Sequence, residues 1–200
     1  MRWLLALLLL SSVASADDDI PSTHKGQFGI SARFGLGIRG IAPYNNEYCG
    51  VLDSNEASGN AHVCTARSPL FLDLEPSFGV AQSVELTLGF HIGLEGDFGA
   101  TPASSGPRAF RLEPGARFFL SEGGHSKLFV QPSLLIDFTN YQKQSGGSYG
   151  TDVGVRFNQG YWIDLHRAVG LYFFVSESVE FARWISADLD AGIGIQGRYP

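Results

Sequence analysis

The stretch VELTLGFHIGLE, residues 84–95, alternates between apolar residues and polar or small ones along its whole length. A period of two places these two sets of side chains on opposite faces of a β-strand. The stretches FGISARFGLGIR, residues 28–39, and ISADLDAGIGIQ, residues 185–196, alternate in the same way. The sequence therefore predicts strands with one apolar face and one face of charged residues and glycine.

Five further ranges show this pattern less regularly: 70–80, 108–120, 127–139, 150–163 and 168–179. The connections between the eight predicted strands alternate in length. Those at 81–83, 121–126 and 164–167 are short, those at 40–69, 98–107 and 140–149 are longer, and 180–184 is a short exception. Short turns at one rim and long loops at the other are typical of transmembrane barrels. We predict an all-β protein, a closed antiparallel up-and-down transmembrane β-barrel of eight strands.

Three prolines, Pro76, Pro114 and Pro132, stand in the middle of predicted strands. Proline cannot donate a hydrogen bond to a neighbouring strand, and every strand of a closed barrel has two neighbours. We therefore expect bulges or local kinks at these positions.

The N-terminus has the features of a secretion signal. Arg2 precedes an apolar run at 3–10, and Ala14-Ser15-Ala16 is a small-residue cleavage site. The run is shorter than the roughly 20 residues that a membrane-spanning helix needs. We predict a signal peptide at 1–16, cleaved after Ala16, with an uncleaved anchor as the alternative. A periplasmic lead at 17–26 and the barrel at 27–200 follow.

The composition narrows the class of partner. The formal net charge is −6, whereas nucleic-acid binding calls for a basic patch. Charged residues make up 17% of the chain, below the roughly 25% of soluble domains. The lysines are Lys25, Lys127 and Lys143 alone. A sheet surface in water would carry more of them, so the composition favours a lipid-facing sheet.

Cys49 and Cys64 are the only cysteines. Secretion implies an oxidising compartment, in which we expect a disulfide between them. Such a bond contributes about 3 kcal/mol in the chain-entropy model. It is either a structural clip or a staple for a functional surface loop. The polar segment 40–69 that carries both cysteines is either a binding loop of unknown extracellular partner or a solvent-exposed cover.

Periodicity alone does not decide which face points inward. An apolar exterior gives a membrane barrel, and an apolar interior gives a secreted, soluble lipocalin-like barrel that binds an apolar ligand. Small side chains and paired charges suit the narrow interior of eight strands, and strands of this length match a tilted bilayer span. Aromatic residues near the predicted strand ends resemble interfacial girdles; they are Phe28, Tyr161, Trp162 and Tyr199 at one rim, and Phe98, Tyr141, Tyr149 and Trp184 at the other. We predict the membrane barrel.

With the polar face inward, the charged residues form a predicted ion-pair network in the lumen, because an unpaired buried charge costs several kcal/mol. The closure of the barrel places Arg39 near Asp188, and Arg33 near Asp190 or Glu85. The network is either a plug that fills the barrel or a narrow cation path. Its members are Arg33, Arg39, Asp73, Glu75, Glu85, Glu95, Asp97, Arg111, Glu113, Arg117, Asp137, Asp152, Arg156, Asp188, Asp190 and Arg198.

The sequence offers no convincing catalytic group. A histidine base needs a nucleophile within hydrogen-bond distance, and His91 on the polar face is flanked by Gly89 and Gly93. His24, His62, His125 and His166 lie outside the predicted strands. We predict no enzyme activity, cofactor or metal, with a lipid-modifying barrel enzyme as a further alternative.

The alternating pattern over 27–199 resembles the small eight-stranded outer-membrane barrels of Gram-negative bacteria, the OmpA/OmpX type. Residues 192–199, GIGIQGRY, look like the C-terminal assembly signal of that class, although Gly197 replaces a hydrophobic residue and Pro200 follows the aromatic one. The resemblance implies an outer-membrane location and a porin-like, structural or surface-interaction role in the cell envelope. It implies membrane lipid, lipopolysaccharide and the barrel-assembly machinery as partners, and we expect a monomer.

Overall fold

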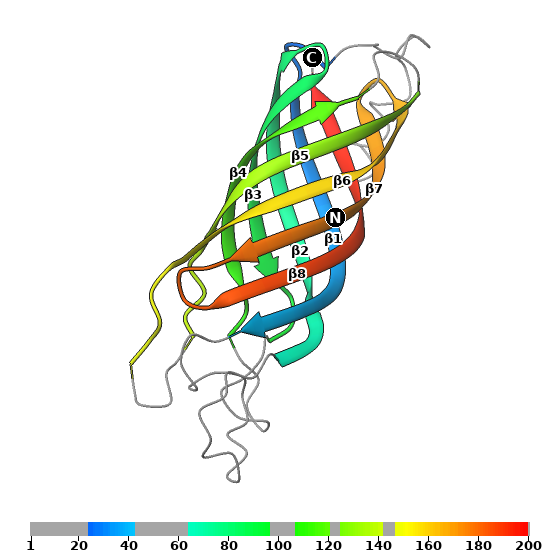
Figure 1. Ribbon diagram of the computed structural model, residues 1–200. Helices are drawn as coiled ribbons and strands as arrows, with labels where there is room; N and C mark the ends of the chain where they lie inside the picture. The colour runs from blue at the N-terminus through cyan, green and yellow to red at the C-terminus, as the bar shows by residue number, and fades with distance from the viewer. Residues whose placement is uncertain (1–23, 43–63, 97–106, 121–124, 142–146, 200) are drawn as a thin grey trace, which may run out of the picture.

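The computed structural model describes residues 24–42, 64–96, 107–120, 125–141 and 147–199. Eight antiparallel strands, each paired with its neighbours in sequence, form a closed barrel (Figure 1). They are β1 (Phe28–Ala42), β2 (Cys64–Ala81), β3 (Val84–Gly93), β4 (Phe110–Phe119), β5 (Ser126–Asp137), β6 (Asp152–His166), β7 (Val169–Glu180) and β8 (Ile185–Tyr199). Among the described residues, no helix is long and apolar enough to cross a membrane. The predicted fold class is confirmed.

The two ends of the barrel differ. Phe28 of β1 pairs with Tyr199 of β8, which closes the barrel. These strand ends lie at the same end as the β2–β3, β4–β5 and β6–β7 connections, which we call the turn end (Figure 1). The connections that follow β1, β3, β5 and β7 lie at the opposite end, the loop end.

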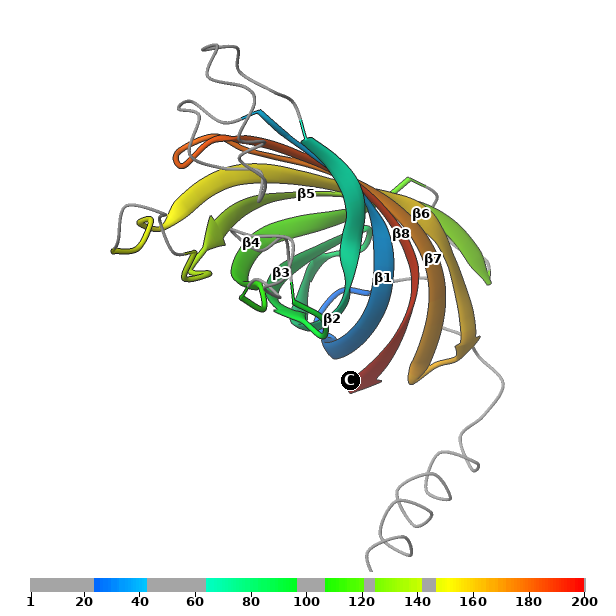
Figure 2. The same cartoon turned by 90° about the horizontal axis from the view of Figure 1, so that it is seen from below.

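Side-chain burial alternates along every strand, and the apolar set faces outward. Ile38, Leu128 and Leu134 are 63%, 55% and 61% exposed, whereas Arg33 and Asp73 are fully buried inside the ring of strands, which Figure 2 shows from below. The predicted orientation is therefore confirmed. A lipocalin-like barrel needs an apolar ligand cavity inside, and nothing in the described interior favours it.

β1 and β2 extend farther at the loop end than predicted. Their pairing continues to Ile41 and Cys64, so residues 64–69, expected within a loop, are part of β2. The rest of that loop, including Cys49, lies outside the described residues, as does the predicted signal peptide. The disulfide and the cleavage site remain predictions.

The bulges expected at the three prolines are absent. Pro114 keeps its register with Leu88 of β3, while on its other side the β4–β5 ladder steps from Leu112 to Gly115 without a shift. Proline lacks an N–H, so one ladder is interrupted and the other continues. Register shifts occur instead beside Leu36, Val80 and Leu165.

Candidate functional site

The interior of the barrel is the candidate site, because it holds most of the charged side chains of the described residues. In the described residues it holds ten carboxylates, eight arginine or lysine side chains and two histidines, all buried. Of the predicted members, Glu95 is exposed and pairs with Arg67 outside the lumen, and Asp97 is not described. The described lumen also contains five charged or titratable residues that were not predicted there: His24, Lys127, Asp164, Glu180 and Arg183.

A central cluster lies midway along the barrel. Arg33 of β1 contacts Asp73 of β2 at 2.9 Å and Glu113 of β4 at 3.6 Å. Arg156 of β6 lies 2.8 Å from Glu113 and 3.5 Å from Asp73. Two arginines and two carboxylates thus link four strands across the lumen. Bidentate arginine geometry suits such bridging.

The predicted partners of Arg33 were wrong. The β1–β2 register sets Arg33 directly opposite Asp73, whereas Asp190 lies opposite Gly37, farther toward the loop end. Asp190 instead lies 3.6 Å from Arg156. Cross-strand register therefore decides these pairs, and it was not available from periodicity alone.

A second cluster fills the loop end. Arg39 donates to both carboxylate oxygens of Asp188, at 2.5 and 3.0 Å, as expected from barrel closure. Arg111 contacts Glu180 at 2.8 Å and Asp188 at 3.4 Å. Arg183 continues the chain of contacts to Asp137 at 2.7 Å and to Asp152 at 3.3 Å. Each carboxylate in this cluster is next to at least one guanidinium.

The third cluster closes the turn end and is centred on His24, a fully buried residue before β1. Its Nδ1 lies 2.5 Å from Glu85, and its Nε2 lies 3.0 Å from the Lys127 ammonium. Because lysine only donates, Nε2 accepts, and Nδ1 carries the hydrogen donated to Glu85. Burial lowers the pKa of His24, against the raising effect of Glu85. The imidazole is therefore held neutral at this end.

Asp164 balances the two cations of the turn-end cluster. It lies 3.1 Å from Lys127 and forms an ion pair with Arg198. The Trp162 indole N–H also donates to it, at 2.8 Å. Asp164 belongs to the same alternating set of β6 as Asp152, which faces the lumen. The sequence did not indicate this because the predicted strand ended at residue 163.

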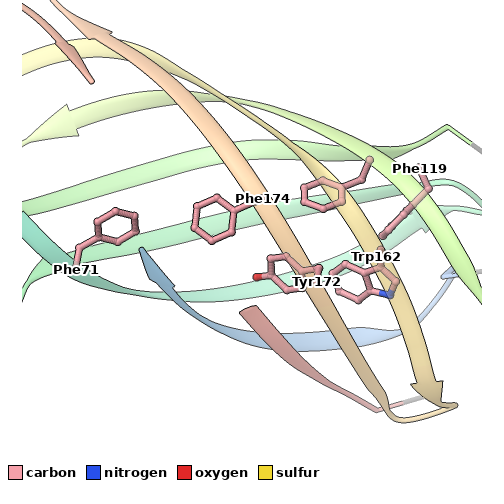
Figure 3. Close-up of a cluster of buried hydrophobic side chains, with 6 residues drawn as sticks. Phe71, Phe119, Trp162, Tyr172 and Phe174 are labelled. Atoms are coloured by element: carbon pink, nitrogen blue, oxygen red, sulfur yellow. The ribbon is translucent and has the colours of Figure 1, made fainter. Parts of the chain in front are cut away.

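Aromatic rings form a cluster of buried side chains inside the barrel (Figure 3). Trp162 and Tyr172 stack with centroids 4.7 Å apart and an interplanar angle of 8°. The Arg117 guanidinium lies over both rings, at 5.1 and 5.3 Å, and pairs with Glu75 and Glu85. The cluster contains Phe71, Phe119, Phe129, Trp162, Tyr172 and Phe174.

Glycine makes room for this stack. A Cβ on Gly170 would lie 2.3 Å from the Trp162 ring, and one on Gly194 would lie 2.3 Å from the Tyr172 ring. Gly194 pairs with Tyr172 in the β7–β8 register. The rings therefore lie flat over neighbouring strands where a side chain would otherwise stand.

The expected aromatic girdles are only partly present. Trp162 is buried in the interior cluster, and Tyr141 and Trp184 pack with Ile41 inside the loop end, next to Tyr149. Trp162 points inward because of its position in the alternation of β6, and Tyr141 and Trp184 point inward beside the ends of strands. Phe28, Tyr161 and Tyr199 are exposed, as expected, and Phe98 is not described.

His91, on the inward face of β3, contacts a carboxylate and an aromatic ring. His91 Nδ1 lies 2.7 Å from Asp73 and its ring packs on Phe71 at 4.6 Å. Within the described ranges, no group of three His, Cys, Asp or Glu residues could hold a metal ion. His62 lies outside those ranges.

An apolar exterior around a closed ring of strands, with ion pairs and aromatic rings inside, defines a small membrane-spanning β-barrel. No protein-family model matches the chain, and no curated protein matches it significantly. Solved structures do. The N-terminal β-barrel domain of Pseudomonas aeruginosa OprF superposes with a TM-score of 0.57 at 11% identity, over 88% of this chain and 98% of that one.

Two further structures give the same result. Neisserial surface protein A has a TM-score of 0.55 at 10% identity, over 88% of this chain and 100% of that one. Outer membrane protein AlkL, determined in DMPC bilayers, has a TM-score of 0.54 at 10% identity, over 92% and 95%. The chain therefore has the fold of the small eight-stranded outer-membrane barrels, and the resemblance seen in the sequence is confirmed for the fold.

Proposed function

We propose that this protein is a structural and surface-interaction barrel of the outer membrane, with a lumen that is filled rather than open. The observation that carries the proposal is the succession of side-chain layers across the lumen. From the turn end, these are the His24 cluster, the Trp162–Tyr172 stack, the Arg33–Arg156 cluster with the Phe174 and Phe71 rings against its guanidinium groups, the Arg39–Asp188 cluster, and the packed rings of Tyr141 and Trp184. Such a plug leaves at most a very narrow pore.

The exterior supports the proposed location. Lipid cannot satisfy unpaired backbone groups, and a closed barrel pairs all of its strands. The proposal includes a signal peptide cleaved after Ala16, insertion by the barrel-assembly machinery, and contact with membrane lipid and lipopolysaccharide. The proposal does not include catalysis.

The loop end supports a surface role. The β1–β2 pair extends past the end of β3 at Gly93, and Thr65 and Arg67 of this extension are exposed. The segment between these strands, within the predicted loop 40–69, would face outward from the cell. We propose it as the part that meets an extracellular partner, whose identity is unknown.

Conductance across a planar lipid bilayer tests the plug. We expect the wild-type protein to show no steady conductance, or only a very small one. A variant with Trp162→Ala and Tyr172→Ala removes the two stacked rings and should raise it. Large, stable channels in the wild type would refute the filled lumen.

Cell fractionation tests the location. The protein should enter the membrane fraction, dissolve only with detergent, and migrate differently in gels before and after heating. Recovery in the soluble periplasm would refute a membrane barrel. The same gel assay provides the folding control for the conductance experiment. Without heating, the variant with Trp162→Ala and Tyr172→Ala should migrate as the folded wild-type protein does.

A further inference from the structure

The lipid-facing surface carries two polar side chains in an otherwise apolar belt. Gln159 of β6 and Glu177 of β7 are both exposed, and the Gln159 amide donates to the Glu177 carboxylate at 3.2 Å. The two residues lie on adjacent strands, since Phe157 pairs with Glu177 and Gln159 with Val175. They form the sole such pair on the outward face between the two rims of the described strands.

The pair lies well inside the belt. Outward neighbours along β6 are Val155 and Phe157 on one side and Tyr161 on the other. Along β7, Val175 and Val179 flank Glu177, and all of these neighbours are exposed. A charged side chain that faces hydrocarbon is costly. The single bond to Gln159 leaves acceptor positions on the carboxylate and a second amide hydrogen on Gln159.

Two grooves flank the pair on the outer wall of β5, β6 and β7. One includes Leu134, Val155 and Glu177 in its lining. The other includes Leu128, Gln159 and Phe173. The surface thus offers apolar hollows on both sides of a hydrogen-bonding centre. On β8, the small residues Ala187 and Ala191 stand beside β7, opposite Val179 and Val175.

We propose that this face, the Gln159–Glu177 patch, is the contact surface for a second copy of the same chain in the membrane. The inference rests on the proposed membrane location, and it departs from the monomer expected from the sequence. The partner is a second copy because the patch contains both a donor and an acceptor. A two-fold axis along the membrane normal lets each Gln159 meet the Glu177 of the other copy.

Two-fold symmetry also explains the flanking hollows. An isologous interface places the same patch on both sides, so exposed ridges such as Phe157 and Phe173 can enter the partner's grooves. Small residues allow backbones to approach closely in membranes, and amide side chains form bonds across the contact. The remaining hydrogen-bonding positions of the pair are satisfied in the dimer and face acyl chains in the monomer.

Sedimentation equilibrium in density-matched detergent micelles tests the dimer. The wild-type protein should self-associate reversibly as the ratio of protein to detergent rises. Glu177→Leu and Gln159→Leu should each weaken association about tenfold, the order expected for losing the reciprocal bonds of a two-fold contact. Glu177→Gln keeps the donor and acceptor positions and should retain most of the association. Glu95→Leu, at a glutamate of the loop end that pairs with Arg67, is the control outside the patch and should leave association unchanged.

Folding separates this proposal from a structural role for the pair. Glu177→Leu places an apolar residue against lipid, so insertion into phosphatidylcholine vesicles and the gel shift on heating should be unaffected. A wild type that stays monomeric at every ratio, or a Glu177→Leu variant that associates normally, overturns the dimer. A monomer in micelles that binds a different protein in native membranes also overturns it. If the wild type does not insert into vesicles, the proposed membrane location fails as well.

Discussion

Polar side chains on the inner face of the barrel make contacts across the lumen, whereas those on the outer face make only local contacts. Inside, Arg33 reaches carboxylates on β2 and β4, so one side chain joins strands that do not pair with each other. Outside, Gln159 reaches only the adjacent strand. Inward polar groups are thus bound into a network that spans the lumen, whereas the outward pair is local. The interior therefore holds distant strands together, while the exterior affects how the barrel meets its surroundings.

The largest effect is expected where the inner network is cut. Arg33→Leu removes a fully buried cation next to Asp73, Glu75 and Glu113. Removing one partner of a buried ion pair costs about 3–5 kcal/mol, because the remaining charge is uncompensated. Urea unfolding of the protein in lipid vesicles, followed by tryptophan fluorescence, measures the loss. A change below about 1 kcal/mol in the free energy of unfolding would contradict this expectation. It would show that Arg156 and water are sufficient to compensate the carboxylates that Arg33 contacts.

A smaller loss is expected from crowding the interior rings. Gly194→Val would force a side chain against the Tyr172 ring, where even a Cβ would come within 2.3 Å. Overpacking of this kind costs about 1–3 kcal/mol. Gly197→Val is the matched control on the same strand, because nothing lies within 4 Å of a Cβ there. The same unfolding experiment and near-ultraviolet circular dichroism compare the two. Equal losses would contradict the packing argument.

The sequence was sufficient to predict the strands and their faces, because period-two alternation is a local property. The eight predicted ranges match the eight strands to within a few residues, apart from the extension of β2. Partner choice was not local. Arg33 pairs with Asp73 because the β1–β2 register sets them opposite each other. The register shift near Leu36 then changes the pairing of the β1 residues from Gly37 to Ile41.

Aromatic residues were the other failure, for a physical reason. Trp162 lies on the inward face by strand parity and stacks there on Tyr172, but a large apolar ring near a strand end also suits a lipid interface. Gly170 and Gly194, on neighbouring strands, provide the space that allows the rings inside. This combination can be recognised only when the register is known. His24 was missed because it precedes the first strand and carries no periodic pattern.

A moderate, pH-dependent effect is expected at the turn end. Burial holds the pKa of His24 below its ordinary value; Glu85 opposes this shift, and the charges of Arg198 and Lys127 add to it. Asp164 lies beyond those two cations. Below about pH 6.5 the unfolded chain takes up a proton that the folded chain does not. The contribution to stability is therefore complete above that pH and falls as the pH decreases.

Stability measured between pH 7.5 and 5 tests this sign. The slope from one such group is at most about 1.4 kcal/mol per pH unit. His24→Gln should remove this component, whereas His125→Gln, at an exposed histidine just before β5, should leave it in place. An unchanged slope in His24→Gln would assign the pH dependence to other groups.

The smallest effect is expected from the ion pair at the loop end that faces solvent. Arg67 and Glu95 are 2.5 Å apart, yet their side chains are 59% and 42% exposed. Water screens such pairs, and holding two long side chains in place costs entropy. Arg67→Leu should therefore leave the unfolding midpoint within experimental error, although the substitution removes an arginine just as Arg33→Leu does. If Arg67→Leu and Arg33→Leu lowered the stability equally, burial would not explain the different contributions of the two ion pairs. A near-silent Arg67→Leu beside a damaging Arg33→Leu would instead assign the stabilising role to charges enclosed by the strands.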